Sequence, residues 1–337
     1  MARAVLAGQA LSESGVVKAM KSSWRQRLYQ AGLVLGSVLL AYQAWTTYTA
    51  LRQNTVRVAA PLLLVVAWGL IMVATGIQIT AWSYLMRWLG VQLMWRQFMR
   101  GYMLPFLARY VPGSVWGYLS RSQWMQHHFH VPYSTSNIGS ALEVMSLLTA
   151  AGVIVSAYFT FNSGGLLQIG LLGVTVLLPS MCWLGLWSLG RGRLFNRLSA
   201  GGLAVDVASV LPLHRWMSVI GLHVLLWVCY GGAVSLTVMA LNVLPRGGIL
   251  AVTFIFTVAW LAGFLFVFVP AGLGVRELTL AGLLVSNLGL SVGPASAIAL
   301  IVRAFILLAE AVFVILGMVA NPKERSQPRS DLERLGN

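Results

Sequence analysis

Charged residues are scarce in this chain. Asp, Glu, Lys and Arg together make up 9% of its 337 residues, whereas hydrophobic residues make up 58%. An ordinary soluble domain is about a quarter charged, so the composition argues against a soluble globular protein.

Cysteine is also rare. Cys182 and Cys229 are the only two, both inside apolar stretches and without a spacing partner. This excludes a disulfide framework or a cysteine metal knuckle, and we expect both to be packing residues.

Acidic residues are few, with eight Asp and Glu in all, and the common catalytic motifs are missing. The first aspartate is Asp206, too late for the outer-loop acidic ligands or base expected of a membrane glycosyltransferase. The chain has no G-x-S-x-G elbow, no phosphate-binding loop and no H-E-x-x-H. His127, His128 and His130 form one cluster, but no carboxylate lies near them in sequence, and we expect an interfacial polar loop there. We therefore expect no enzyme, no cofactor and no metal site.

Long uncharged runs dominate what is present. A helix needs about 20 apolar residues to cross a bilayer core, and these runs are continuously apolar instead of alternating as in a membrane barrel. The pattern predicts an all-α helical membrane bundle of about eight segments: 29–50, 58–84, 137–159, 166–189, 217–241, 249–269, 274–291 and 294–320. The seventh is short, and the sequence leaves open whether it spans or re-enters. We expect one membrane domain, 29–320, between a basic tail, 1–28, and a charged tail, 321–337.

The net charge of +15 could suggest a nucleic-acid partner, but the basic residues flank the apolar segments. Assigning alternate loops to the cytoplasm places 18 of them inside and 3 outside. Cytoplasmic loops of membrane proteins carry such an excess. We therefore expect no nucleic acid and two cytoplasmic termini.

Three arginines, Arg121, Arg276 and Arg303, lie inside or against apolar runs. A charge there costs about 3 kcal/mol on insertion scales, so each needs a partner. The available carboxylates are Glu143, Glu277 and Glu310. Arg303 and Glu310 are seven residues apart on one helix and so share a face, and we expect them to meet Glu277 and Arg276 in the bundle interior. Guanidinium grips phosphate with two hydrogen bonds, which favours a phosphate-bearing lipid headgroup as ligand. A purely structural ion cluster is the alternative.

Two Pro/Gly-broken segments accompany these charges: RYVPGSVWGYLSR over 109–121 and PAGLGVRE over 270–277. Glycine allows close backbone approach and proline stops a helix. We expect both segments to dip into the bundle, so that a helix N-terminus with free N–H groups faces an anion. The alternative is that the prolines and glycines only kink membrane helices and form no site.

These two segments, with the helix bearing Glu143 in ALEVMSLL, resemble the signature blocks of the lysylphosphatidylglycerol synthase transmembrane region, a flippase-like membrane domain. Members often have arginine directly after this glutamate, where this chain has Val144, and glycine where it has Ala271. The residues that match the family's motifs are, in the first block, Pro112, Gly113, Trp116 and Arg121 and, in the second block, Pro270, Gly272, Gly274, Arg276 and Glu277.

The resemblance implies an inner-membrane protein that moves or presents lipid-linked polar groups. Only 17 residues follow Ala320, so we expect no aminoacyl-transferring domain and no lysyl transfer. The expected partners are anionic or phosphate-bearing membrane lipids, including polyprenyl-phosphate-linked saccharides. The alternative is a scaffold for a lipid-modifying enzyme or glycosyltransferase. The candidate substrate-binding residues are Arg109, Pro112, Gly113, Trp116, Arg121, Glu143, Pro270, Gly272, Gly274, Arg276, Glu277, Arg303 and Glu310.

Overall fold

The computed structural model describes residues 23–53, 58–105, 115–162, 165–191, 212–241, 248–266 and 269–319. No strand occurs in these ranges, and the predicted all-α fold is confirmed. The helices in chain order are α2 (Ser23–Arg52), α3 (Pro61–Trp88), α4 (Trp95–Met103), α5 (Val115–Phe129), α6 (Tyr133–Asn162), α7 (Gly165–Arg191), α10 (Leu213–Ala240), α11 (Gly248–Leu265), the 3₁₀ turn η2 (Pro270–Gly272), α12 (Val275–Leu288) and α13 (Val292–Val319).

Each of the eight predicted apolar segments coincides with one helix: α2, α3, α6, α7, α10, α11, α12 or α13. Within the described ranges, α3, α6, α10, α11 and α13 are long and apolar enough to cross a membrane. The chain is therefore a multi-pass membrane protein.

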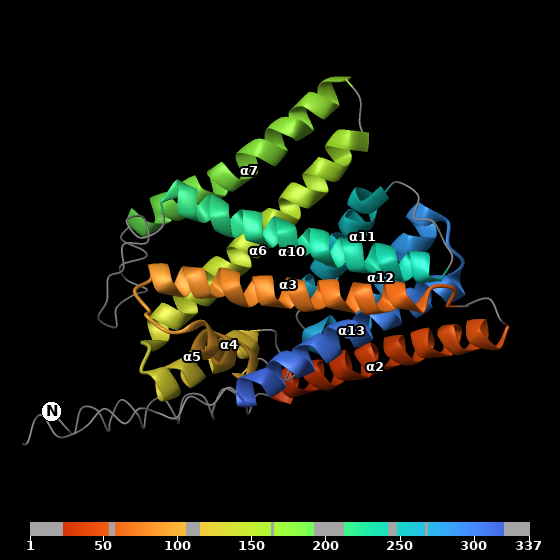
Figure 1. The fold of residues 1–337 in the computed structure, drawn as a ribbon, viewed down its shortest axis with the longest axis horizontal. Coiled ribbons are helices and arrows are strands. Elements are labelled where there is room, and N and C mark those ends of the chain that lie inside the picture. The colour runs from red at the N-terminus through yellow and green to blue at the C-terminus, as the bar shows by residue number, and fades with distance from the viewer. Residues whose placement is uncertain are drawn as a thin grey trace, which may run out of the picture.

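Helices α3 and α10 form the centre of the bundle and run antiparallel, as Figure 1 shows. The start of α3 meets the end of α10, where the Ala59 N–H donates to the Ala240 carbonyl at 2.8 Å. Two buried tryptophans of α10 tie it to its neighbours. Trp216 Nε1 donates to the Pro179 carbonyl of α7 at 3.1 Å, and Trp227 Nε1 donates to the Leu147 carbonyl of α6 at 3.3 Å. Each indole N–H thus has an acceptor inside an apolar core.

Two short-helix hairpins interrupt the pattern of long helices. The first, α4–α5, lies between α3 and α6, and its helices have 9 and 15 residues. The second, α11–α12, lies between α10 and α13, and Figure 1 shows α10 ending and α13 beginning toward the same end of the bundle. Helix α12 has 14 residues, about 21 Å, which is shorter than the roughly 30 Å hydrocarbon core. The seventh apolar segment is therefore too short to cross the hydrocarbon core as a straight helix by itself.

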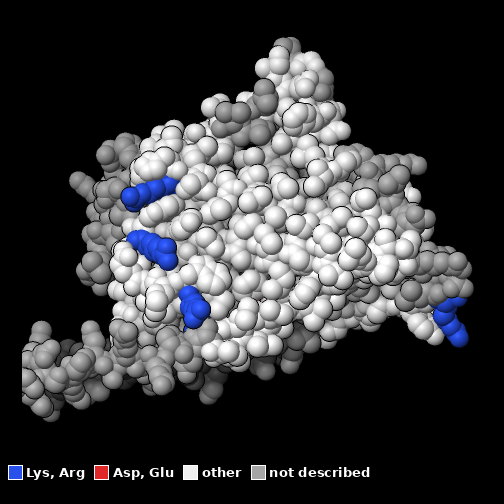
Figure 2. Space-filling view, in the orientation of Figure 1, with Lys and Arg blue, Asp and Glu red and all other residues white. Residues whose placement is uncertain are grey.

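Basic side chains gather toward one end of the face in Figure 2, with another at the opposite end. Arg87 in the last turn of α3 and Arg96 in the first turn of α4 are both exposed. Arg215 in the first turn of α10 reaches the Trp88 ring, with 5.7 Å between its Cζ and the ring centroid. Figure 1 shows α2 beginning and α13 ending toward this same end. The arrangement suits the predicted orientation, but the side of the membrane that this end faces stays a prediction.

The histidine cluster departs from the prediction of a loop. Helix α5 continues to Phe129, so His127 and His128 belong to its last turn, where both are exposed. The His128 ring stacks on Trp124 with 4.1 Å between centroids, and His128 Nδ1 lies 3.1 Å from the Trp124 carbonyl. Only His130 stands outside, with a positive φ of 53° that ends the helix. Aromatic packing therefore extends α5 by a turn that the sequence did not suggest.

Candidate functional site

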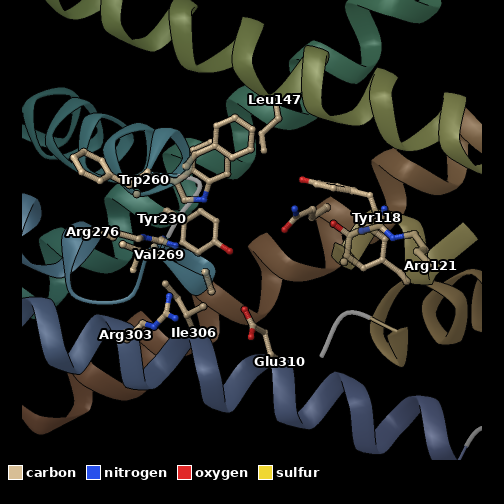
Figure 3. A pocket seen from close by; sticks show the side chains of 18 residues that line it. Tyr118, Arg121, Leu147, Tyr230, Trp260, Val269, Arg276, Arg303, Ile306 and Glu310 are labelled. Atoms are coloured by element: carbon tan, nitrogen blue, oxygen red, sulfur yellow. The ribbon is translucent and has the colours of Figure 1, made fainter. Parts of the chain in front are cut away.

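A cavity of about 130 Å³ lies where the two hairpins meet. The first hairpin contributes Tyr102, Tyr118 and Arg121, and the second contributes Ala271, Gly272 and Arg276. Figure 3 shows Tyr118 and Arg121 on one side and Arg276 and Val269 on the other, with Arg303, Ile306 and Glu310 of α13 along the floor. The three arginines that the sequence placed in apolar runs thus line a single cavity.

Arg121 and Glu143 form a fully buried ion pair between α5 and α6. The Arg121 Nη1 to Glu143 Oε2 distance is 2.6 Å, and the two side chains are 1% and 2% exposed. The Tyr102 hydroxyl donates to the other carboxylate oxygen, Oε1, at 2.5 Å. Both oxygens of Glu143 are therefore satisfied.

Aromatic rings surround the Arg121 guanidinium. Its Cζ lies 3.9 Å from the ring centroid of Tyr102, 5.0 Å from that of Trp82 and 5.4 Å from that of Tyr118. Both oxygens of Glu143 have partners and the guanidinium is enclosed, so the cluster of Arg121, Glu143 and Tyr102 holds α5 against α4 and α6. We call this cluster the structural clasp.

The second charged cluster joins α12 to α13. Arg303 Nε lies 3.3 Å from Glu277 Oε1, with side chains 7% and 2% exposed, so the predicted meeting of these residues is confirmed. The other Glu277 oxygen, Oε2, accepts the Gly274 N–H at 2.7 Å. The expectation that the N-terminus of this helix keeps its N–H groups for an anion is thus wrong at Gly274. Glu277 itself caps α12 there, as acidic residues in a first turn commonly do.

Arg276 and Glu310 complete the charged lining. Both are half-buried, and the Arg276 Cζ lies 4.8 Å from the Phe256 ring centroid. Glu310 stands two turns after Arg303 on α13, and both line the cavity. The sequence correctly predicted that these side chains share one region of the bundle interior.

The tip of the second hairpin depends on left-handed backbone. Gly272 and Gly274 have φ of 65° and 78°, and Ala271 has 50°. L residues with a Cβ rarely adopt these angles, which explains why glycine is usual where this chain has Ala271. A Cβ on Gly272 would stand 2.8 Å from the Gly263 carbonyl oxygen of α11. Contact between two glycines therefore lets the tip fold back against α11.

We expect Gly272→Ala to lower the free energy of unfolding by about 1–3 kcal/mol, because strained φ and contact with backbone both oppose a side chain there. The measurement is denaturant or thermal unfolding of the protein in detergent. Gly170→Ala is the matched control, since a Cβ at Gly170 on α7 meets nothing within 4 Å. Equal losses for the two variants would contradict the packing role of Gly272.

Some predicted residues cannot be placed in the cavity. Arg109, Pro112 and Gly113 lie outside the described residues, and the side chains of Trp116 and Pro270 do as well. The structure also adds cavity residues that the sequence analysis missed: Gln78, Tyr102, Tyr118, Tyr230 and Trp260. Gln78 could have been predicted as a cavity residue, because it is the one Asn or Gln side chain in the predominantly apolar α3. The aromatic residues could not, because nothing in the sequence distinguishes an aromatic ring that lines a cavity from one that packs in the core.

Fold and cavity define a class: a multi-pass helical membrane protein with buried arginines at an internal cavity. The family model of the lysylphosphatidylglycerol synthase TM region matches residues 29–317, and the chain belongs to this family. The family suggested by the sequence motifs is thereby confirmed. Comparison with curated proteins and comparison with solved structures each find no match.

Proposed function

We propose that the cavity binds the phosphate-bearing headgroup of an anionic membrane lipid or a polyprenyl-phosphate-linked saccharide, and that the protein moves or presents this group across the membrane without acting as an enzyme. The observation that carries the proposal is that Arg276 of α12 and Arg303 of α13 line one cavity, which Arg121 lines as part of the structural clasp. Ionisable residues at membrane depth commonly mark the path of a polar cargo.

Arg303 is the best-placed phosphate ligand. It is the twelfth of the 28 residues of α13, near the middle of a membrane-spanning helix. Its Nη2 is buried and has no hydrogen-bond partner among the described residues, and its Nε reaches Glu277 only as an ion pair. A buried donor without a partner costs about 1–3 kcal/mol. An incoming phosphate oxygen would satisfy it, and Arg276 lines the same part of the cavity.

The two hairpins supply a physical basis for movement. Broken helices at midplane sites are typical of transporters whose halves rock around a fixed site. Here the cavity lies between hairpin α4–α5 and hairpin α11–α12. A change in the position of either hairpin would open the cavity toward one end of the bundle.

The test is lipid movement in proteoliposomes, with lipids labelled on the acyl chain so that the headgroup is natural. We expect the native protein to speed transbilayer movement of phosphate-bearing lipids, and Arg276→Gln to slow it at least about tenfold, as loss of a charge-assisted hydrogen bond predicts. Arg215→Gln, at the end of the bundle, is the control and should match the native rate. A native rate equal to that of empty liposomes would refute translocation.

A scaffold for a lipid-modifying enzyme or glycosyltransferase is the second candidate. It is favoured by the exposed Arg87 and Arg96 at the end of the bundle where basic side chains gather. A scaffold predicts that changing Arg87 and Arg96 to glutamine abolishes function in cells while Arg276→Gln is tolerated. Translocation predicts the reverse pattern.

A further inference from the structure

A neutral polar group shares the cavity with the arginines. Gln78 is the eighteenth of the 28 residues of α3, a helix whose most apolar window has a mean hydropathy of 2.3. Its half-buried side chain lines the cavity. Within the described part of the chain, its amide forms no hydrogen bond. An amide in the middle of such a helix is costly unless it finds a partner.

The chemistry of an amide differs from that of the arginines around it. Gln78 offers two N–H donors and one carbonyl acceptor, whereas guanidinium offers donors alone. A hydroxyl group both donates and accepts, so one or two neighbouring hydroxyls can satisfy a carboxamide fully. An ammonium group can only donate, and a phosphate diester can only accept.

Aromatic rings form part of the wall of the same cavity. Tyr230 and Trp260 both line the cavity, and Figure 3 shows them between Arg276 and Leu147. The Trp260 ring is fixed by Phe264, stacked at 5.1 Å between centroids, and by Trp227, edge-on at 5.2 Å. Rigid aromatic faces with a few convergent polar groups are typical of small-molecule sites. They suit the C–H faces of glycerol or a sugar.

We propose that Gln78 determines specificity for a headgroup that carries hydroxyl groups beyond its phosphate, with the phosphate on Arg303 and the hydroxyls on the Gln78 amide. The proposal rests on the function proposed above and narrows its ligand. A glycerol headgroup and a phosphate-linked sugar share this chemistry. Headgroups that end in an amine or a methyl group lack it.

The experiment measures binding of defined lipids to the full-length protein in detergent by native mass spectrometry. Phosphatidylglycerol is compared with phosphatidylmethanol, which has the same phosphodiester charge and no hydroxyl. A polyprenyl-phosphate hexose is compared with the methyl diester of the same polyprenyl phosphate, so that the two sources of hydroxyls are distinguished. Phosphatidylethanolamine tests the amine headgroup.

We expect the native protein to prefer at least one hydroxyl-bearing lipid over its methyl counterpart by roughly five- to tenfold, the size of one or two neutral hydrogen bonds. Gln78→Leu should remove this preference while binding the methyl diesters as tightly as the native protein does. Gln78→Asn, which keeps the carboxamide, should restore part of the preference. Gln92→Leu, at an exposed position just beyond α3, should leave it unchanged.

Three results would overturn the specificity role alone: an unchanged preference in Gln78→Leu, an equal loss for hydroxyl-bearing and methyl lipids, or a native preference for phosphatidylethanolamine. Each of these leaves the phosphate site intact. Failure of the native protein to bind any phosphodiester lipid would instead refute the proposed function, and the specificity proposal with it.

Discussion

Glu143→Ala is expected to destabilise the protein by about 3–5 kcal/mol, the usual cost of removing one partner from a buried ion pair. The Arg121 guanidinium, 1% exposed, would keep its charge while losing its carboxylate. The Tyr102 hydroxyl would lose its acceptor at the same time. Unfolding in detergent, followed by circular dichroism or thermal aggregation, measures the loss.

A compensated variant shows whether this cluster is a clasp. Replacing a buried ion pair with apolar residues of similar size is often neutral, so Arg121→Met with Glu143→Leu and Tyr102→Phe, which also removes the orphaned hydroxyl, should recover most of the stability lost in Glu143→Ala. We also expect it to bind phosphate-bearing lipids, because Arg276 and Arg303 remain. A compensated variant that folds stably and binds no lipid would show that Arg121 contacts the ligand directly.

Removing the second charge pair should act on binding instead. The double variant Arg303→Gln with Glu277→Gln deletes both charges of the pair, and the introduced amide oxygen at 277 can still accept the Gly274 N–H that caps α12. Loss of the charged donor should raise the Kd for phosphatidylglycerol about 10- to 100-fold, corresponding to hydrogen bonds to charged groups of about 1.5–3 kcal/mol. Stability should change far less than in Glu143→Ala.

The measurement is lipid titration by native mass spectrometry, with unfolding recorded on the same samples. Arg215→Gln serves as the control for the loss of one arginine, since it lies at the end of the bundle beside Trp88. Unchanged affinity in the double variant would remove Arg303 from the binding site.

The helical fold could be predicted from the sequence, because membrane-spanning helices are uninterrupted apolar runs of about 20 residues. All eight runs became helices. The end of the seventh apolar segment was not readable, because Gly289 ends α12 in a left-handed conformation with φ 71°. The sequence contained that glycine, but only the backbone angle shows where the helix stops.

Part of the candidate site could be predicted from the sequence, because charged residues in apolar runs need partners of opposite charge. Arg303 and Glu277 were predicted to meet, and they do. Which glutamate serves Arg121 depends on the packing of α5 against α6, and that packing is set by contacts distant in sequence. The role of Tyr102 was beyond prediction for the same reason: 41 positions separate it from Glu143. Capping of α12 by Glu277 follows a local three-residue rule and could have been anticipated.

The charged contacts of the two hairpins differ in length. The first hairpin is held by a carboxylate that accepts a hydrogen bond of 2.6 Å from Arg121 and one of 2.5 Å from Tyr102. The second is held by a 3.3 Å ion pair between Arg303 and Glu277 and by a contact between two glycines, and Arg303 Nη2 has no hydrogen-bond partner among the described residues. A phosphate bound to Arg303 would therefore compete with Glu277 for the same guanidinium. Binding in the cavity would then weaken a contact between α12 and α13.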